Sequence, residues 1–203
     1  MTSPPPSPRR TVVVPLSPPS WTPPGVDPAR WRRALAEDVV DLLATLAEVE
    51  PAVAALAEDH ELAGSVVWPT MRVYEVPALT ANVIFAAAAA DGYDQAAIVA
   101  PDAPDLPAML IGKLLRPLSS RPVAVAPGAV GGLLGLAARL PVPEWLPEID
   151  LAGEAATVRA AAPGPGDVAI VPGWHRLSGP DGLSRLDPAL EGWEATRALL
   201  SAA

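Results

Sequence analysis

The chain has 203 residues, of which 50% are hydrophobic and 18% are charged, so it can build one domain around a sizeable core. The formal net charge of −9 argues against a nucleic-acid-binding surface, which would require clustered positive charge. The absence of cysteine excludes thiolate chemistry and disulfides and fits a reducing, cytoplasmic compartment. Aromatic residues are only 4% of the chain, and a core of small aliphatic side chains favours the close packing of helices on a sheet in an α/β fold.

No segment is predicted to span a membrane. The longest charge-free apolar stretch, Pro122 to Ala138, contains two prolines and four glycines. It also falls short of the roughly 20 residues that a spanning helix needs.

The N-terminal residues divide into a tail and a first strand. Residues 1–10 are rich in proline and polar side chains, so we predict a disordered tail outside a single domain of residues 11–203. The β-branched run from Thr11 to Leu16 predicts the first strand.

A proline-rich loop from Ser17 to Gly25 follows, where a doubly wound sheet places its nucleotide-phosphate turn. We therefore treat Pro15, Leu16 and Gly25 as candidate nucleotide-binding residues. The loop has no basic residue that could bind phosphate. Arg30, at the start of the next helix, is the candidate for this role, together with the free N–H groups of the helix N-terminus. The alternative for Arg30 is a plain solvated position.

The first helix is predicted from Pro28 to about Ala47, with Asp27 as its N-cap. Asp38 falls within the apolar stripe of this helix, where an unpaired carboxylate would be costly. We therefore predict that Asp38 is buried and that backbone N–H groups of the neighbouring loops or an arginine satisfy it.

Three further elements are predicted before the middle of the chain. Residues 52–57 form a second strand, and the acidic segment 58–61 is more typical of solvated surface than of a metal site. Residues 66–76 contain a short strand or a hairpin. Residues 79–91 form a helix that stops at a glycine.

The most informative stretch runs from Ala96 to Leu118. A run of small apolar residues ends in Pro-Asp, which predicts a buried parallel strand that delivers the Asp102 carboxylate to the C-terminal edge of the sheet. Ligands bind at this edge in open α/β sheets. Asp105 is predicted to cap the helix that starts near Pro107. Asp102 is not predicted to cap a helix. Two roles for it, closing the turn and binding a ligand, are equally supported by the sequence.

The C-terminal half repeats the alternation of strands and helices. A glycine turn at Gly131 and Gly132 is predicted to enter a strand. The other predicted elements are strands at 122–126, 133–138 and 167–171, helices at 151–161 and 192–201, and a short helix that starts at 178–181. Ser178 is predicted to cap a helix and His175 to be a loop residue. A serine hydrolase is disfavoured, because these two residues lack a nucleophile elbow and an acid partner.

Three segments resemble a bacterial glycosyltransferase-like family of the nucleotide-diphospho-sugar transferase superfamily. Ile98-Val-Ala-Pro-Asp-Ala-Pro-Asp-Leu-Pro107 is similar to its specific Gly-Thr-Asp-Ser-Pro-Asp-Leu-Pro motif, and weaker likeness covers residues 34–43 and 126–134. Relatives include guanylyltransferases of molybdenum-cofactor and deazaflavin-cofactor synthesis. The resemblance implies a three-layer αβα sandwich with a mostly parallel sheet, of the GT-A type.

The resemblance also implies a site. The family's Asp-Gly-Gly-Tyr segment corresponds to Val130-Gly131-Gly132-Leu133, which keeps the turn, makes both glycines nucleotide-binding candidates and lacks the carboxylate. Metal-assisted phosphoryl or glycosyl transfer needs a cation held by carboxylates. Asp102 is the one candidate ligand, so Mg²⁺ or Mn²⁺ would be held weakly.

The sequence therefore predicts a glycosyltransferase-like or nucleotidyltransferase-like protein that binds a nucleotide or nucleotide-sugar, with activity reduced or lost. The alternative is a non-catalytic binding or interaction protein that retains the fold. The C-terminal edge of the sheet discriminates between them. An open polar pocket around Asp102 supports the first, and an edge filled by Val130, Leu133 and the proline loop supports the second.

Overall fold

Seven strands form one sheet, in the order β3-β2-β1-β4-β6-β5-β7, in the computed structural model, which describes residues 7–202. Within these residues β6 runs antiparallel to β4 and β5, and the other pairings are parallel. The strands are β1 (Arg10–Pro15), β2 (Glu50–Ala55), β3 (Arg72–Glu75), β4 (Gln95–Val99), β5 (Val123–Pro127), β6 (Leu133–Arg139) and β7 (Val168–Ile170). The prediction of a mostly parallel α/β sheet is confirmed.

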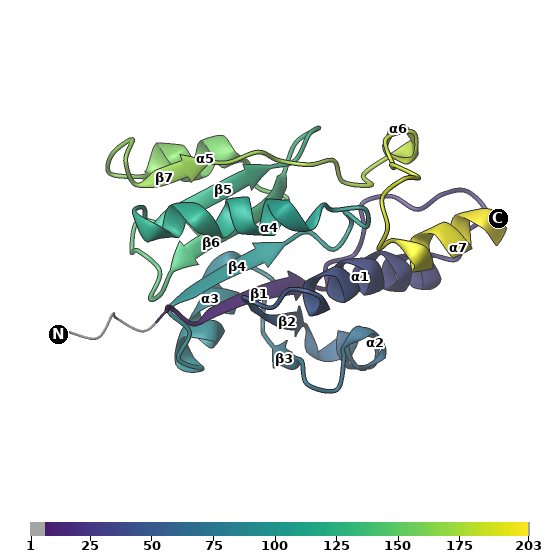
Figure 1. Cartoon of the computed structure of the whole chain (residues 1–203), viewed down its shortest axis with the longest axis horizontal. Coiled ribbons are helices and arrows are strands. Elements are labelled where there is room, and N and C mark those ends of the chain that lie inside the picture. The colour runs from purple at the N-terminus through teal and green to yellow at the C-terminus, as the bar shows by residue number, and fades with distance from the viewer. Residues whose placement is uncertain (1–6, 203) are drawn as a thin grey trace.

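Helices cover both faces of this sheet, with α1 and α4 in front of the strands in Figure 1 and α3 behind them. The helices are α1 (Pro28–Ala44), α2 (His60–Val66), α3 (Ala81–Ala90), α4 (Ala108–Leu115), α5 (Ala155–Ala161), α6 (Pro180–Leu183) and α7 (Glu194–Ala202), with 3-10 turns η1 (Ala57–Asp59) and η2 (Arg116–Ser119). Across residues 7–202, no helix combines the length and the apolar character needed to cross a bilayer.

The strand side chains alternate between two cores, as the two-residue period of a β-strand requires. In β1, Val12 and Val14 face the core beneath α1, α2 and α4, whereas Val13 faces the core beneath α3 and α5. Strand β4 is buried along its whole length, because it lies in the middle of the sheet with helices over both faces. The result is the predicted three-layer sandwich.

Some element bounds differ from the prediction. Of the two alternatives for the segment 66–76, the strand is observed: β3 pairs in parallel with β2, and Val66 ends α2. The first helix ends at Ala44, earlier than predicted, although Asp27 caps it as expected and accepts the N–H of Arg30 over 2.8 Å.

The predicted tail at residues 1–10 is only partly described. Residues 1–6 lie outside the described residues. At the end of this segment the Arg9 N–H donates to the Asp94 carboxylate over 2.7 Å, and Arg10 opens β1. The sheet therefore begins earlier than the composition suggested.

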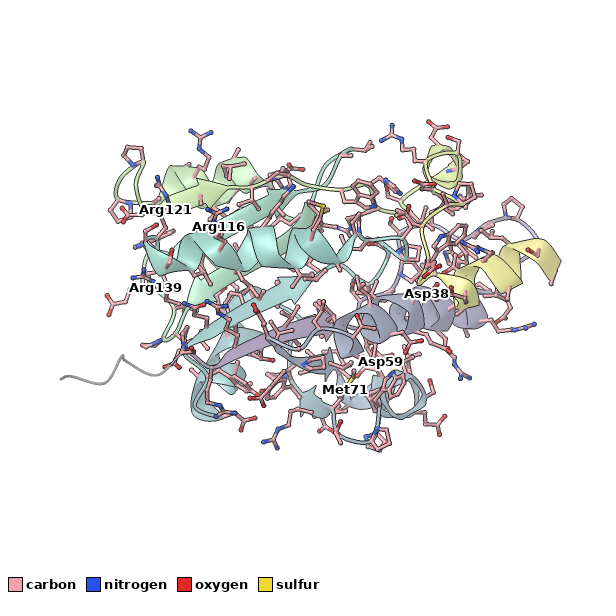
Figure 2. The ribbon with its side chains drawn as sticks, in the orientation of Figure 1. Asp38, Asp59, Met71, Arg116, Arg121 and Arg139 are labelled. Atoms are coloured by element: carbon pink, nitrogen blue, oxygen red, sulfur yellow. The ribbon has the colours of Figure 1, made fainter. Side chains whose placement is uncertain are left out.

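Helix α7 packs against α1, and Asp38 joins the two helices (Figure 2). Asp38 is 2% exposed, and its carboxylate accepts the N–H groups of Ala195 and Thr196, both over 2.9 Å. These N–H groups lie in the first turn of α7, where no intrahelical acceptor exists. The prediction of a buried and satisfied Asp38 is confirmed, but its partners are N–H groups of a helix and not those of a loop or an arginine. Burial raises the pKa of Asp38 to about 6, although hydrogen bonds from Thr196 and Ala195 act in the opposite direction.

Candidate functional site at the C-terminal edge of the sheet

Loops after β1, β5 and β7 meet the loop before α5 at the edge where the parallel strands end. A pocket of about 310 Å³ opens among them. Its lining residues are Ser20, Ala129, Val130, Gly131, Gly132, Ala152, Glu154, Arg176 and Ser178. The structure thus brings both predicted glycines to one pocket with a residue of the proline-rich loop and an arginine that the sequence analysis did not single out.

The two-glycine turn has a backbone that other residues rarely adopt. Gly131 has a φ of 110° and Gly132 a φ of 68°. A Cβ on Gly132 would also lie 2.9 Å from the Leu151 carbonyl oxygen and 3.0 Å from Nη1 of Arg176. The Gly132 N–H donates to Oε1 of Glu154 over 3.1 Å. The turn is therefore closely packed, and a carboxylate already holds one of its N–H groups.

Asp102 and Arg176 form a bidentate ion pair beneath the pocket. Nε of Arg176 lies 2.7 Å from Oδ1 of Asp102, and Nη2 lies 3.0 Å from Oδ2. The Asp102 side chain is only 3% exposed. The expectation that Asp102 has no structural partner is therefore wrong. The partner lies 74 positions away in the chain, so no local pattern could reveal it.

Arg176 also holds the surrounding backbone. Its Nη1 donates to the carbonyl oxygens of Leu133, over 3.1 Å, and Leu151, over 2.7 Å. These four hydrogen bonds use four of the five guanidinium N–H donors. The remaining N–H, on Nη2, has no acceptor within residues 7–202, and the side chain is 17% exposed at the pocket wall.

The sequence contained a signal for Arg176 that the motif comparison passed over. Thirteen of the fourteen basic residues are arginine, and Arg176 stands in the stretch Trp174-His175-Arg176-Leu177, just after the last predicted strand. An arginine between large apolar or aromatic neighbours at the end of a strand is a candidate for a buried ion pair, because such a charge must be matched.

Asp105 does not cap α4, contrary to the prediction. Its carboxylate lies 2.9 Å from Nε2 of His175 and accepts from Nε1 of Trp174 over 3.1 Å. The N-cap of α4 is Pro107, which forms no side-chain cap hydrogen bond. His175 is a loop residue as predicted, but it is buried. Asp105 therefore fixes the segment after β7 and leaves the helix uncapped.

Ser178 does not cap α6 either. The N-cap position belongs to Gly179, and no side chain caps the helix. Ser178 instead lines the pocket beside Arg176.

The other nucleotide-binding candidates do not line this pocket. Pro15 and Leu16 are buried at the end of β1, and Gly25 is an exposed turn residue with a φ of 84°. Arg30 lines a separate hollow of about 280 Å³ between α1 and α7. Ser20 is the residue of the proline-rich loop that lines the pocket, and roles for the other four stay predictions.

Arg32, two residues after Arg30 in the first helix, is bound to the acidic segment instead of the pocket. Its Nη2 lies 2.6 Å from Oδ2 of Asp59 and also donates to the carbonyl oxygen of Leu16. The acidic segment 58–61 therefore supplies a partner for Arg32, and Arg176 is left as the arginine of the pocket.

The divalent cation implied by the family resemblance does not fit the residues present. Both oxygens of Asp102 are bound to Arg176, and the carboxylate of Glu154 is bound to the Gly132 N–H. Val130 occupies the position of the family's second carboxylate and is 71% exposed. In the described part of the chain, no group of three or more His, Asp or Glu side chains is arranged to hold a metal ion.

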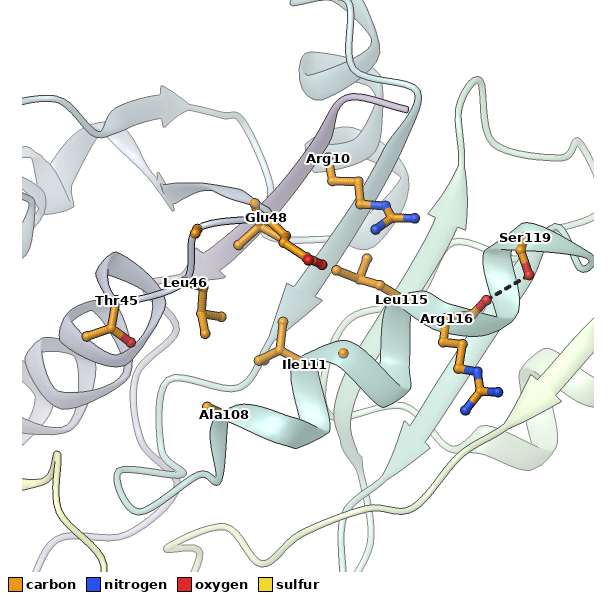
Figure 3. A pocket seen from close by; sticks show the side chains of 12 residues that line it. Arg10, Thr45, Leu46, Glu48, Ala108, Ile111, Leu115, Arg116 and Ser119 are labelled. Carbon is orange, nitrogen blue, oxygen red and sulfur yellow. Dashed lines mark hydrogen bonds between the residues drawn. The ribbon is translucent and has the colours of Figure 1, made fainter. Parts of the chain in front are cut away.

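A different cavity, of about 530 Å³, lies between α1 and α4 at the opposite edge of the sheet (Figure 3). Leu46, Ile111 and Leu115 give it an apolar wall, and Arg10 and Arg116 lie beside it. None of the candidate site residues lines this cavity, so it is separate from the C-terminal edge.

No protein-family model and no curated protein matches the sequence. Solved structures match across nearly the whole chain. One, described as a nucleotide-diphospho-sugar transferase of Desulfovibrio desulfuricans, is 18% identical with a TM-score of 0.66, over 95% of this chain and 97% of the relative.

Two further structures carry ligands. CMP:2-keto-3-deoxy-manno-octonic acid synthetase in complex with CTP is 13% identical with a TM-score of 0.56, over 96% of this chain and 99% of the relative. A Mycobacterium tuberculosis protein in complex with manganese is 11% identical with a TM-score of 0.51, over 91% of this chain and 100% of the relative. At such identities the likeness establishes the fold alone. The chain therefore has the fold of the nucleotide-diphospho-sugar transferases and of the related cytidylyltransferases, as its sequence motif predicted.

Proposed function

We propose that the protein binds a nucleotide or nucleotide-sugar in the pocket at the C-terminal edge, with the phosphates beside Gly131, Gly132 and Arg176. The observation that carries the proposal is that the turn at Gly131 and Gly132 lines the same pocket as the Arg176 guanidinium, which has one N–H group without an acceptor in residues 7–202. A backbone without side chains lets phosphate approach closely, and a guanidinium matches its oxygens. The similar synthetase structure, which contains CTP, supports this choice of ligand.

The N-terminal loop has a supporting role in this proposal. Pro15, Leu16 and Gly25 shape the loop from which Ser20 reaches the pocket, and Arg30 at the start of α1 adds positive charge at the same end of the sheet. The free N–H groups at the start of α1 favour an anion nearby.

Transfer activity is reduced or lost in this proposal. Catalysis of phosphoryl or glycosyl transfer requires charge stabilisation that grows in the transition state. Asp102 is already paired, and Val130 stands where the resembled motif has a carboxylate. Any Mg²⁺ or Mn²⁺ would depend on the substrate's own phosphates for most of its ligands and would be held weakly.

The alternative is a non-catalytic interaction protein, and one observation favours it. Val130 presents an exposed apolar side chain on the pocket wall, where a polar ligand would gain little from it. An exposed apolar side chain of this kind is more typical of a contact with another protein.

Thermal unfolding in the presence of nucleoside triphosphates, diphosphates and nucleotide-sugars tests the proposal, because a ligand that binds the native state raises the unfolding temperature. Val130→Trp should abolish the shift by filling the pocket. Met109→Trp, at an exposed apolar position on α4, is the matched control and should leave the shift unchanged. Stabilisation by none of these ligands would reject nucleotide binding and favour the interaction protein, and robust turnover of any of them would reject the loss of activity.

A further inference from the structure

We infer that Arg176 takes the place of a divalent cation at this site, so that the diphosphate of a nucleotide binds without a metal ion. This inference rests on the proposed nucleotide-binding function and specifies how the phosphate charge is met. It starts from the misfit between the expected metal and the residues present at the edge of the sheet.

The first step is the state of the Asp102 carboxylate. Both of its oxygens accept hydrogen bonds from one guanidinium, at 2.7 and 3.0 Å, and the side chain is almost fully buried. A metal ion bound there would have to expel a guanidinium that also holds the carbonyls of Leu133 and Leu151. Breaking a buried ion pair by removing one partner is strongly unfavourable, so the site retains its arginine.

The second step is the charge balance. A divalent cation between two carboxylates forms a neutral unit, and so does one guanidinium with one carboxylate. The chain has a valine, Val130, at the position of the second carboxylate, and it supplies one positive charge through Arg176. Loss of one carboxylate and replacement of the cation by a guanidinium therefore leave the local charge unchanged.

The third step is access to the phosphate. The guanidinium forms part of the pocket wall, and a Cβ on Gly132 would lie only 3.0 Å from Nη1, so the turn and the arginine are in close proximity. A phosphate held at the turn would therefore lie beside this guanidinium, whose Nη2 keeps one N–H without an acceptor in residues 7–202. Arginine presents its N–H groups in fixed directions that suit phosphate oxygens, which a metal ion would otherwise coordinate.

Glu154 competes with a phosphate for the N–H group of Gly132. Its carboxylate accepts the Gly132 N–H that a phosphate would use, and the residue is exposed and can rotate away. Binding therefore requires displacement of the Glu154 side chain, and no rearrangement of the buried ion pair.

Calorimetric titration of the native protein with ADP, GDP, CDP and UDP, in EDTA and in excess Mg²⁺, tests the inference. We expect at least one diphosphate to bind with affinities that agree within about threefold in the two buffers, since a factor of three is well under 1 kcal/mol. Binding in Mg²⁺ alone would overturn the inference and leave nucleotide binding intact. Binding in neither buffer would overturn both.

Asp102→Asn provides the second arm. Removing the negative charge beside Arg176 should tighten diphosphate binding in EDTA by about tenfold, because a nearby opposing charge is removed. If Asp102 were a metal ligand, the same change would weaken binding in Mg²⁺. The melting curve of the variant shows whether it is folded.

The native protein also permits a test without nucleotide. Electron paramagnetic resonance with Mn²⁺ alone should detect no bound ion at this edge. Uptake of Mn²⁺ by the native protein that Asp102→Asn abolishes would show that the carboxylate is free for metal and would contradict the replacement by Arg176.

Discussion

Thr196 donates its backbone N–H to the carboxylate of Asp38 over 2.9 Å, although the two residues are 158 positions apart. Asp38 lies in the middle of α1, and it satisfies the N-terminus of α7 as an N-cap residue would. The negative charge also lies at the positive end of the α7 dipole. A single carboxylate therefore joins the two helices.

Replacing Asp38 with Ala should destabilise the protein by about 1–3 kcal/mol, because two buried N–H groups lose their acceptor. The matched control is Glu37→Ala, which removes an i, i+4 pair with Arg33 on the surface of the same helix and should cost less than about 0.5 kcal/mol. Urea denaturation of the three proteins measures the difference. Equal losses of unfolding free energy in the two variants would contradict a stabilising role for the hydrogen bonds of Asp38.

The pKa of Asp38 predicts how stability depends on pH. Burial raises this pKa from 3.8 to about 6, so the folded state binds the proton more tightly than the unfolded state does. The contribution of Asp38 to stability is therefore largest below pH 4 and falls as the pH rises through 6. The cost of Asp38→Ala should be greater at pH 4.5 than at pH 7.5 by on the order of 2 kcal/mol. Denaturation at the two pH values measures this difference, and an equal cost at both would contradict the raised pKa.

Breaking the ion pair beneath the pocket should destabilise the protein strongly. Asp102→Ala leaves a buried guanidinium without its partner and should cost about 3–5 kcal/mol. The double substitution Asp102→Ala with Arg176→Ala should cost less than the sum of the single changes. Denaturant unfolding of the four proteins forms the cycle, and additive effects would mean that the two side chains do not interact.

Gly132→Ala should be destabilising by more than 1 kcal/mol, since the positive φ and the approach of Leu151 and Arg176 both oppose a Cβ. Gly64→Ala is the control, because Gly64 lies in α2 with nothing within 4 Å of an added Cβ. That change should stabilise the protein by about 0.4–1 kcal/mol. Melting temperatures that move in the same direction for both variants would contradict the strained turn.

Glu154→Gln should tighten nucleotide binding, because it removes a negative charge that competes for the Gly132 N–H. A gain of roughly 3-fold to 10-fold is expected from the loss of one nearby charge. Glu148→Gln makes the same charge change at an exposed residue that does not line the pocket, and it should have little effect. Calorimetric titration compares the variants, and a matched gain in both would indicate general electrostatics alone.

Local patterns in the sequence predicted most of the fold. The apolar run of β4 and the apolar stripe of α1 depend on neighbouring residues, so the buried central strand and the burial of Asp38 followed from periodicity. The antiparallel direction of β6 did not, because nothing in the segment 133–138 distinguishes it from a parallel strand. The three-layer arrangement followed from the resemblance to a known family.

The candidate site was less predictable, since its contacts join distant segments. The glycine turn was found through its motif. The capping rule assigned Asp105 to α4, yet its donors Trp174 and His175 lie 69 and 70 positions away. Asp102 was likewise predicted to bind a metal ion, whereas it binds Arg176. A motif specifies where a carboxylate lies in the chain but not which group binds it.

The placement of α7 on α1 has a consequence for synthesis. Trp31 and Leu35 of α1 are buried in a small cluster that includes Leu199 and Leu200 of α7. A ribosome that has not yet translated residues 194–202 therefore presents a nascent chain whose first helix lacks its cover and whose Asp38 lacks its N–H partners. This corner of the domain must fold after translation of α7, and until then its apolar surface is available to chaperones that bind nascent chains.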